Sequence, residues 1–135
     1  MKLASLTLGT NDRSRATEFY NALLESRGYT LFEEHKEKGE IHSTLWIKDR
    51  FIFGVAEPFD GKPATHANGS VIGFQMETKE EVDAIHAKAM EMGGTSEGEP
   101  GPRDGGYAAY ARDLDKNKLC FFVPEYAELV NGNPE

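Results

Sequence analysis

Apolar and polar residues alternate along residues 3–9 (LASLTLG), which is typical of a β-strand with Leu6 and Leu8 on one face and Ser5 and Thr7 on the other. Asn11 or Asp12 then offers a side-chain cap for a helix that ends at Gly28. The apolar face of this helix consists of Ala16, Phe19, Tyr20, Leu23 and Leu24. Three more strands are predicted, at residues 29–34, 41–48 and 51–56.

The same order of elements returns after residues 57–69 (EPFDGKPATHANG), which have no periodicity and read as a linker. A strand is predicted at residues 71–76, and Thr78 and Glu81 form a capping-box pattern before a second helix. Its apolar face consists of Val82, Ile85, His86, Ala89 and Met90. Both helix faces and both terminal glycines, Gly28 and Gly94, match at an offset of 66 residues.

The pattern therefore predicts an α+β fold of two βαβββ units within a single domain of residues 1–135. The units span residues 1–56 and 70–125, the linker spans 57–69, and a tail spans 126–135. Because Gly28 to Phe51 and Gly94 to Asn117 are both 23 residues, we expect the third and fourth strands of the two units to be in register.

One helix covers only one face of each sheet, so the other face has to meet something else. The helix side is predicted to hold Leu6, Leu8, Leu45, Ile47, Phe51, Phe53, Ile72, Phe74, Leu119, Phe121 and Val123. The opposite side is predicted to hold Ser5, Thr7, His42, Thr44, Trp46, Gly54, Val71, Gln75, Tyr110, Arg112, Cys120 and Phe122. The second set mixes aromatic and polar side chains, as small-molecule clefts do.

Composition narrows the function classes. The net charge of -8 opposes nucleic acids and anionic membrane surfaces, and it favours a cationic small molecule. A single cysteine excludes an intramolecular disulfide, and the opening residues lack the features of a signal peptide. No apolar run approaches the ~20 residues that cross a bilayer. The expected location is the cytoplasm.

Three segments together resemble a known family: LTLGTNDRSRATEFYNALLESRGY, EPFDGKPATHANGSVIGFQ and GGYAAYARDLDKNKL. They are similar to the vicinal oxygen chelate superfamily, which includes glyoxalases, bleomycin-resistance proteins and extradiol dioxygenases. The resemblance implies a mixed sheet cupped around a central cleft. It also implies a homodimer, and in the enzymes a divalent metal held by His, Gln or Glu from the first and last strand of each unit.

The residues at those four ligand positions depart from the family pattern. They are Ser5, Gly54, Val71 and Cys120, and the thiol is the one metal-binding group among them. We therefore predict that the usual metal is not bound and expect no cofactor. A divalent metal would require non-standard ligands, such as His42 and Glu57.

Several predicted cleft residues could bind a ligand or react. Cys120 is a candidate nucleophile or redox-sensitive thiol, against the simpler interpretation that it fills space in a strand. Tyr110 and Arg112 are suited to a carboxylate or phosphate, although Arg112 could instead pair with nearby aspartates. His42 is a candidate base, and Trp46 beside it would supply a stacking surface. The catalytic candidates are thus His42, Tyr110 and Cys120.

The predicted ligand-contacting set is Ser5, Thr7, His42, Trp46, Gln75, Tyr110, Arg112, Cys120 and Phe122. The leading hypothesis is a protein that binds a small molecule in the cleft without the metal. The alternative is a glyoxalase-like lyase or dioxygenase-type enzyme, metal-free or with non-standard ligands. A third possibility is a relic that acts as a dimerisation partner.

Overall fold

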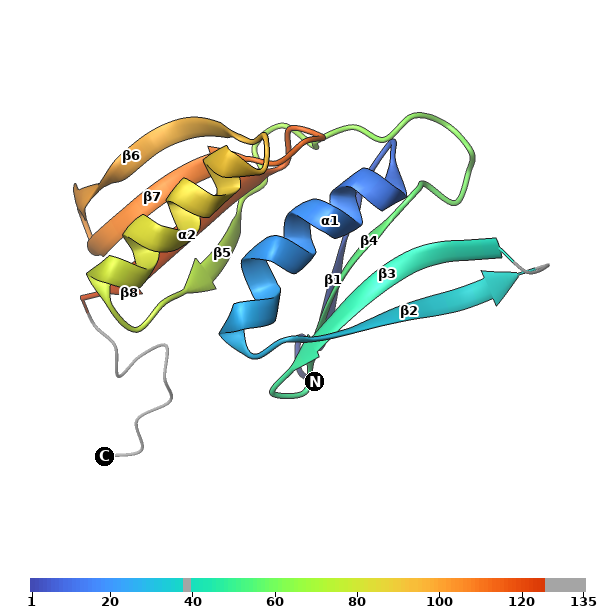
Figure 1. Cartoon of the computed structure of the whole chain (residues 1–135), viewed down its shortest axis with the longest axis horizontal. Helices are drawn as coiled ribbons and strands as arrows, with labels where there is room; N and C mark the ends of the chain where they lie inside the picture. The colour runs from blue at the N-terminus through green and yellow to red at the C-terminus, as the bar shows by residue number, and fades with distance from the viewer. Residues whose placement is uncertain (38–39, 126–135) are drawn as a thin grey trace. The chain divides into compact units, whose positions relative to one another are not determined.

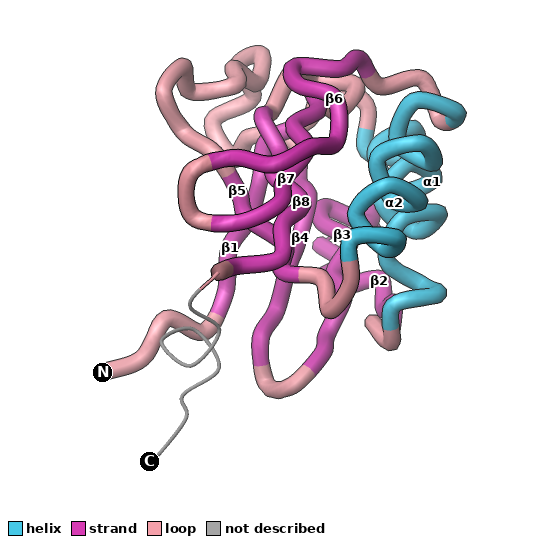
Figure 2. The backbone as a smooth tube through the Cα atoms, turned by 90° about the vertical axis from the view of Figure 1, so that its left-hand side faces the viewer, coloured by secondary structure: helices cyan, strands magenta, loops and turns pink. Residues whose placement is uncertain are grey.

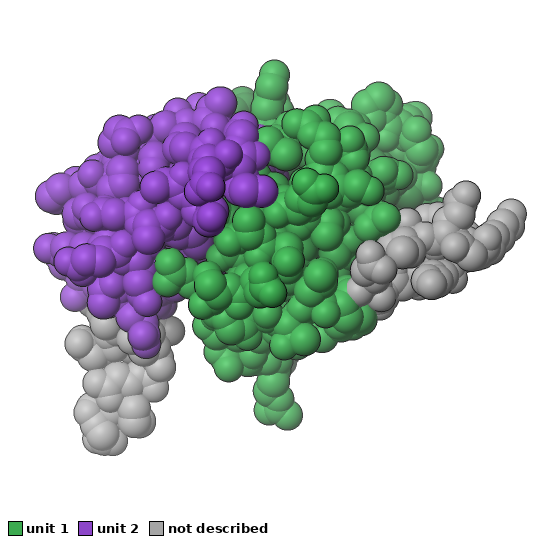
Figure 3. Space-filling model, in the orientation of Figure 1, with its two compact units in different colours: residues 1–68, 114–117 green, residues 69–113, 118–135 purple. Residues whose placement is uncertain are grey.

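The computed structural model describes residues 1–37 and 40–125, and for residues 33–37 and 40–42 it describes the backbone alone. Its first unit contains residues 1–68 and 114–117, and its second contains residues 69–113 and 118–125 (Figure 3). None of the helices in these described residues has the length and apolar composition needed to cross a membrane.

The first unit is a four-stranded mixed sheet with one helix (Figure 1). Its elements are β1 (Ser5–Gly9), α1 (Arg13–Leu24), a short 3₁₀ turn η1 (Glu25–Arg27), β2 (Thr30–Glu37), β3 (Glu40–Lys48) and β4 (Phe51–Ala56). The strand order is β1-β4-β3-β2, with β1 parallel to β4 and the other pairs antiparallel. Asp12 caps α1 by accepting a hydrogen bond from the Arg15 backbone N–H, which confirms one of the two predicted caps.

The second unit repeats this arrangement. Its elements are β5 (Ile72–Gln75), α2 (Lys79–Glu91), β6 (Thr95–Arg103), β7 (Gly106–Arg112) and β8 (Lys118–Pro124). The strand order is β5-β8-β7-β6, again with the first pair parallel. Thr78 and Glu81 form the predicted capping box. In Figure 2 the helix of each unit lies on one side of its strands, so the α+β fold of two βαβββ units is confirmed.

The core of each unit lies between its helix and its sheet. In the first unit, Phe19, Tyr20 and Leu23 of α1 are almost completely buried, as are Phe53 and Val55 of β4. In the second unit, the buried side chains include Val82, Ile85, Ala89, Leu119 and Phe121. His86, from the predicted apolar face of α2, is buried with them, and its Nε2 lies 3.2 Å from Ser96 Oγ.

The predicted face of β3 is wrong. Lys48 pairs with Phe51 across a two-residue turn, Asp49 and Arg50, both of which have positive φ. This register places Trp46 directly opposite Phe53, and opposite residues share a face of the sheet. Thr44 and Trp46 therefore face α1 and are fully buried. Leu45 and Ile47, which were predicted to face the helix, lie on the opposite face of the sheet. We call the face of each sheet that lies away from its own helix the open face.

The third strands are also one residue out of the predicted register. Leu45 pairs with Gly54 and Tyr110 pairs with Cys120, so β3 and β7 are offset by 65 residues while β4 and β8 are offset by 66. The cause is the turn between β7 and β8, where residues 113–117 separate the paired Arg112 and Lys118. This turn is longer than the turn at Asp49.

The longer turn has its own hydrogen-bonding role in the first unit. Asp115 accepts from Thr10 Oγ1 at 2.5 Å and from the Asn11 backbone N–H at 2.9 Å. Asn117 Nδ2 donates to the Gly9 carbonyl at 3.2 Å. The D-x-D-x-N-K motif thus ties the turn to the segment between β1 and α1.

Candidate functional site

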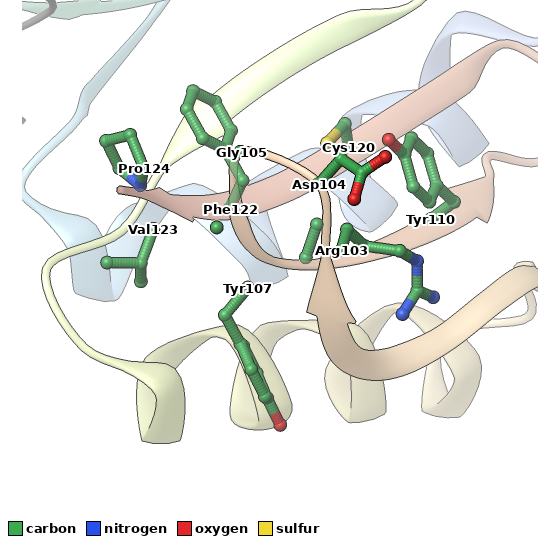
Figure 4. Close-up of a pocket in the computed structure, with 11 residues that line it drawn as sticks. Arg103, Asp104, Gly105, Tyr107, Tyr110, Cys120, Phe122, Val123 and Pro124 are labelled. Carbon is green, nitrogen blue, oxygen red and sulfur yellow. The ribbon is translucent and has the colours of Figure 1, made fainter. Parts of the chain in front are cut away.

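The open face of the second sheet contains a hollow of about 340 Å³. We call it the second-sheet hollow, and it lies toward the turn between β6 and β7 (Figure 4). The residues that line it belong to this turn and to β7 and β8: Arg103, Asp104, Gly105, Gly106, Tyr107, Ala108, Tyr110, Cys120, Phe122, Val123 and Pro124.

The register of the sheet explains why three of the predicted residues meet there. Gly98, Tyr110, Cys120 and Gly73 form one row across the four strands, and opposite residues share a face. Phe122 stands in the next row, and its ring lies over Gly73, where an added Cβ would be 3.1 Å from the ring. Small residues therefore leave space between the aromatic rings.

Arg103 lines the hollow and was not predicted from the sequence. Its guanidinium folds back along β6, where Nη2 donates to the Glu99 carbonyl at 2.7 Å and Nη1 to the Pro102 carbonyl at 3.2 Å. A Cβ on Gly98 would lie 3.2 Å from both Arg103 Nη2 and the Tyr110 ring, so glycine makes room for both groups. The turn sequence Arg-Asp-Gly-Gly could have indicated a charged rim, but its direction depends on irregularities in β6.

Tyr110 and Cys120 hydrogen bond with each other inside the hollow. Burial raises the pKa of the Cys120 thiol, while the Tyr110 hydrogen bond and the charges of Arg103 and Lys118 act to lower it. The pKa of Tyr110 is raised as well, first by the charge of the Cys120 thiolate, then by their hydrogen bond and by burial. At neutral pH both groups are therefore protonated, and the thiol lacks the thiolate character of a reactive cysteine.

Arg112 belongs to the same face but does not line the hollow. Its Nη2 pairs with Glu97 Oε1 at 3.2 Å, across from β7 to β6. Lys118 lies 3.9 Å from the same carboxylate oxygen and has its Nζ 5.2 Å from the centre of the Tyr110 ring. These partly exposed charges lie on one side of the row of Tyr110 and Cys120, and Glu97 is a partner that was not foreseen for Arg112.

The remaining predicted residues lie elsewhere. Gln75 is exposed on β5, in the row of Phe122, and Ser5 and Thr7 are exposed on β1 of the first unit. Trp46 is fully buried under α1, and its Nε1 donates to Asn21 Oδ1 at 3.1 Å, so it is not available as the wall of a cleft. His42 lies in β3, but its side chain is outside the described part of the structure.

The donor atoms at the four family ligand positions do not fit a divalent metal. Gly54 and Val71 have no side-chain donor, and the Leu45 side chain lies so close to Gly54 that an added Cβ would be 2.6 Å from its Cδ2. Ser5 is exposed, so the single Cys120 thiol is the one customary metal ligand at these four positions. Among the residues whose side chains are described, no three His, Cys, Asp or Glu groups gather as metal ligands do.

Two βαβββ units, each a four-stranded mixed sheet with a helix on one face, define the class of protein. The chain belongs to the Glyoxalase/Bleomycin resistance protein/Dioxygenase superfamily, whose family model matches residues 2–121.

Solved structures agree with this assignment. A glyoxalase/bleomycin resistance protein from Albidiferax ferrireducens T118 is 36% identical, with a TM-score of 0.79 over 89% of this chain and 96% of that one. A hypothetical protein from S. aureus is 24% identical, with a TM-score of 0.71 over 91% and 96%. A glyoxalase/bleomycin resistance protein/dioxygenase family enzyme from Burkholderia phytofirmans PsJN is 17% identical, with a TM-score of 0.69 over 90% and 97%. The last two show the shared fold. The search of curated proteins found no match.

Proposed function

We propose that this protein binds a small molecule in the second-sheet hollow. The observation that carries the proposal is the lining itself. The Phe122 ring, the protonated Tyr110 and Cys120 groups and the Arg103 guanidinium surround one space of about 340 Å³. Ligand pockets commonly have this volume and combine apolar walls with a few polar groups that orient the ligand.

Binding is proposed to proceed without the divalent metal that enzymes of the superfamily use. Support comes from the donor set, since glycine, valine and serine stand at three ligand positions and a single thiol at the fourth. The test is metal analysis of protein purified without chelators. We expect far less than one Mn, Fe, Ni or Zn per chain, and a full equivalent that survives dialysis would refute this part of the proposal.

A ligand screen tests the binding itself. A fragment library that contains aromatic acids, amides and amines is screened by ligand-observed NMR, together with a glutathione thioether and a cationic glycopeptide. Hits are then titrated against Phe122→Ala, which removes one wall of the hollow. We expect a loss of about tenfold in affinity, the size that follows from about 1.4 kcal/mol of lost apolar contact.

Phe59→Ala is the matched control, because Phe59 is fully exposed in the segment between β4 and β5. It should leave every affinity unchanged. Hits that bind Phe122→Ala as tightly as the wild type would refute the hollow as the binding site. Metal-stimulated turnover of a hemithioacetal or a dioxygenase substrate would favour the alternative, an enzyme of the glyoxalase or dioxygenase type.

A further inference from the structure

The charges near the second-sheet hollow differ from the charge of the whole chain. The chain has a net charge of -8, which taken alone favours a cationic ligand. At the hollow, however, the charged groups that act on the pKa of Cys120 are Arg103 and Lys118, and Arg103 also acts on that of Tyr110. Local cations outweigh a distant net charge because exposed charges are screened within ~10 Å.

Arg103 has the geometry of a carboxylate receptor. Its two hydrogen bonds to backbone carbonyls hold the guanidinium beside the Tyr110 ring and use one N–H of each terminal nitrogen. Three N–H groups of the guanidinium are left, enough for a bidentate contact with a carboxylate. The single O–H of Tyr110 is used in its hydrogen bond with Cys120, so the donors for a carboxylate are those of Arg103.

The apolar part of the hollow lies next to this polar end. Phe122 and Ala108 stand opposite each other on neighbouring strands, with Gly101 beyond Ala108 in the same row. Tyr107, in contrast, points away toward α2, where its hydroxyl donates to Asp83 at 2.7 Å (Figure 4). A flat molecule can therefore lie over Ala108 against the Phe122 ring and direct a charged group toward Arg103.

Asp104 is the one acidic residue in the lining, and it is exposed at the turn between β6 and β7. It contributes to the pKa of neither Tyr110 nor Cys120. Glu97, the other nearby carboxylate, is paired with Arg112 and Lys118. Glu97 is therefore balanced by two cations, and Asp104 is the acid of the lining that opposes Arg103.

We propose that the second-sheet hollow selects small molecules with a flat, apolar body and a carboxylate, which Arg103 binds at the Tyr110 end of the hollow. This inference rests on the proposed function, since it names the ligand class of the same site. It reverses the preference for a cationic ligand that the composition predicts.

The test uses a matched pair of probes, 2-naphthoate and 2-naphthamide, which share one flat body and differ in charge. Each is titrated by NMR into the isotope-labelled full chain, and shifts at the amides of Ala108 and Phe122 report occupancy of the hollow. We expect the acid to bind at least about tenfold more tightly than the amide, as for a charge-assisted contact in a partly exposed site.

Variants assign the difference to Arg103. Arg103→Gln should lower the affinity for the acid by about tenfold and leave the affinity for the amide unchanged. Arg103→Lys should give an intermediate loss of affinity, because lysine keeps the charge but lacks the paired N–H groups of the guanidinium. Asp104→Asn should strengthen binding of the acid only. The matched control is Arg15→Gln, which changes the net charge equally at an exposed position of α1 and should change neither affinity.

The outcomes separate this inference from the proposed function. Equal affinity of acid and amide for the wild type would overturn carboxylate selection but leave binding in the hollow intact. If Arg103→Gln weakened binding of both probes equally while circular dichroism showed an unchanged fold, the role of the charge would be overturned. If neither probe shifts the hollow amides, the inference is wrong, and the fragment screen with Phe122→Ala decides the proposed function.

Discussion

Trp46→Phe tests whether this tryptophan is part of the α1 core or of a ligand wall. The indole is fully buried, and its Nε1 donates to Asn21 Oδ1 at 3.1 Å. The centre of its ring lies 6.1 Å from the ring centre of Tyr20 and 5.9 Å from that of Phe53. The substitution removes one hydrogen bond, about 1 kcal/mol, and leaves a cavity the size of the lost ring atoms, about 1–2 kcal/mol. The expected cost is therefore about 2–3 kcal/mol in the free energy of unfolding.

The assay is urea unfolding followed by far-UV circular dichroism, with the slope of the transition compared between wild type and variant. In the wild type, Trp46 is the single tryptophan, so its emission reports this site alone and should resist quenching by acrylamide. Affinity for the best fragment of the screen should be unchanged in Trp46→Phe. A variant that loses about tenfold in affinity but less than about 1 kcal/mol in stability would refute the buried position.

Two more predictions concern the second-sheet hollow. Because burial raises the pKa of Cys120, its alkylation by iodoacetamide should rise with pH at a midpoint above that of a free cysteine. Tyr110→Phe should move that midpoint higher by removing a hydrogen bond that lowers the pKa; a wild-type midpoint at or below the free value would contradict the raised pKa of Cys120. Gly106→Ala should cost about 3 kcal/mol or more, since φ is +145° and the new Cβ would lie 2.1 Å from the Val123 carbonyl oxygen. Gly61→Ala, at φ +78° with open space around it, should cost about 1 kcal/mol or less, and equal costs in urea unfolding would refute the close approach.

The repeat and the helices could be predicted from the sequence because their causes are local. Helical spacing of apolar residues, an Asp12 or Thr78 cap and a terminal glycine are each determined within a few residues. The family follows from the same local motifs. The face of β3 could not be read from alternation, because both of its faces contain apolar residues. The two-residue turn at Asp49 and Arg50 decides it.

The chemistry of the candidate site depended on contacts that the sequence does not encode locally. Tyr110, Cys120 and Phe122 were placed on the open face correctly, because the two-residue period holds from Tyr110 to Arg112 in β7 and from Lys118 to Phe122 in β8. The state of the Cys120 thiol and the position of Arg103 depend on how β6 bends beside β7. Such bends arise from irregular pairing, and the two glycines and two prolines of β6 give little indication of where it occurs.

The two sheets differ in how the small residue of the equivalent open-face row is covered. In the first unit, Leu45 lies over Gly54, and the Thr7 hydroxyl is beside it, so a large apolar side chain covers the small residue in its own row. In the second unit the equivalent row places Tyr110 and Cys120 between two glycines. The side chain that covers Gly73 is Phe122, from the next row.

In the second sheet, the large side chain that covers the glycine comes from the next row. The free space therefore lies toward Ala108 and the turn at Arg103. A large side chain placed in this volume should therefore close the hollow. Ala108→Leu would put a branched side chain into the lining without removing any of its polar groups, and we expect it to abolish ligand shifts at Phe122. The Tyr110 and Cys120 hydrogen bond should survive, so an unchanged pH midpoint of Cys120 alkylation would show that space, rather than chemistry, was lost.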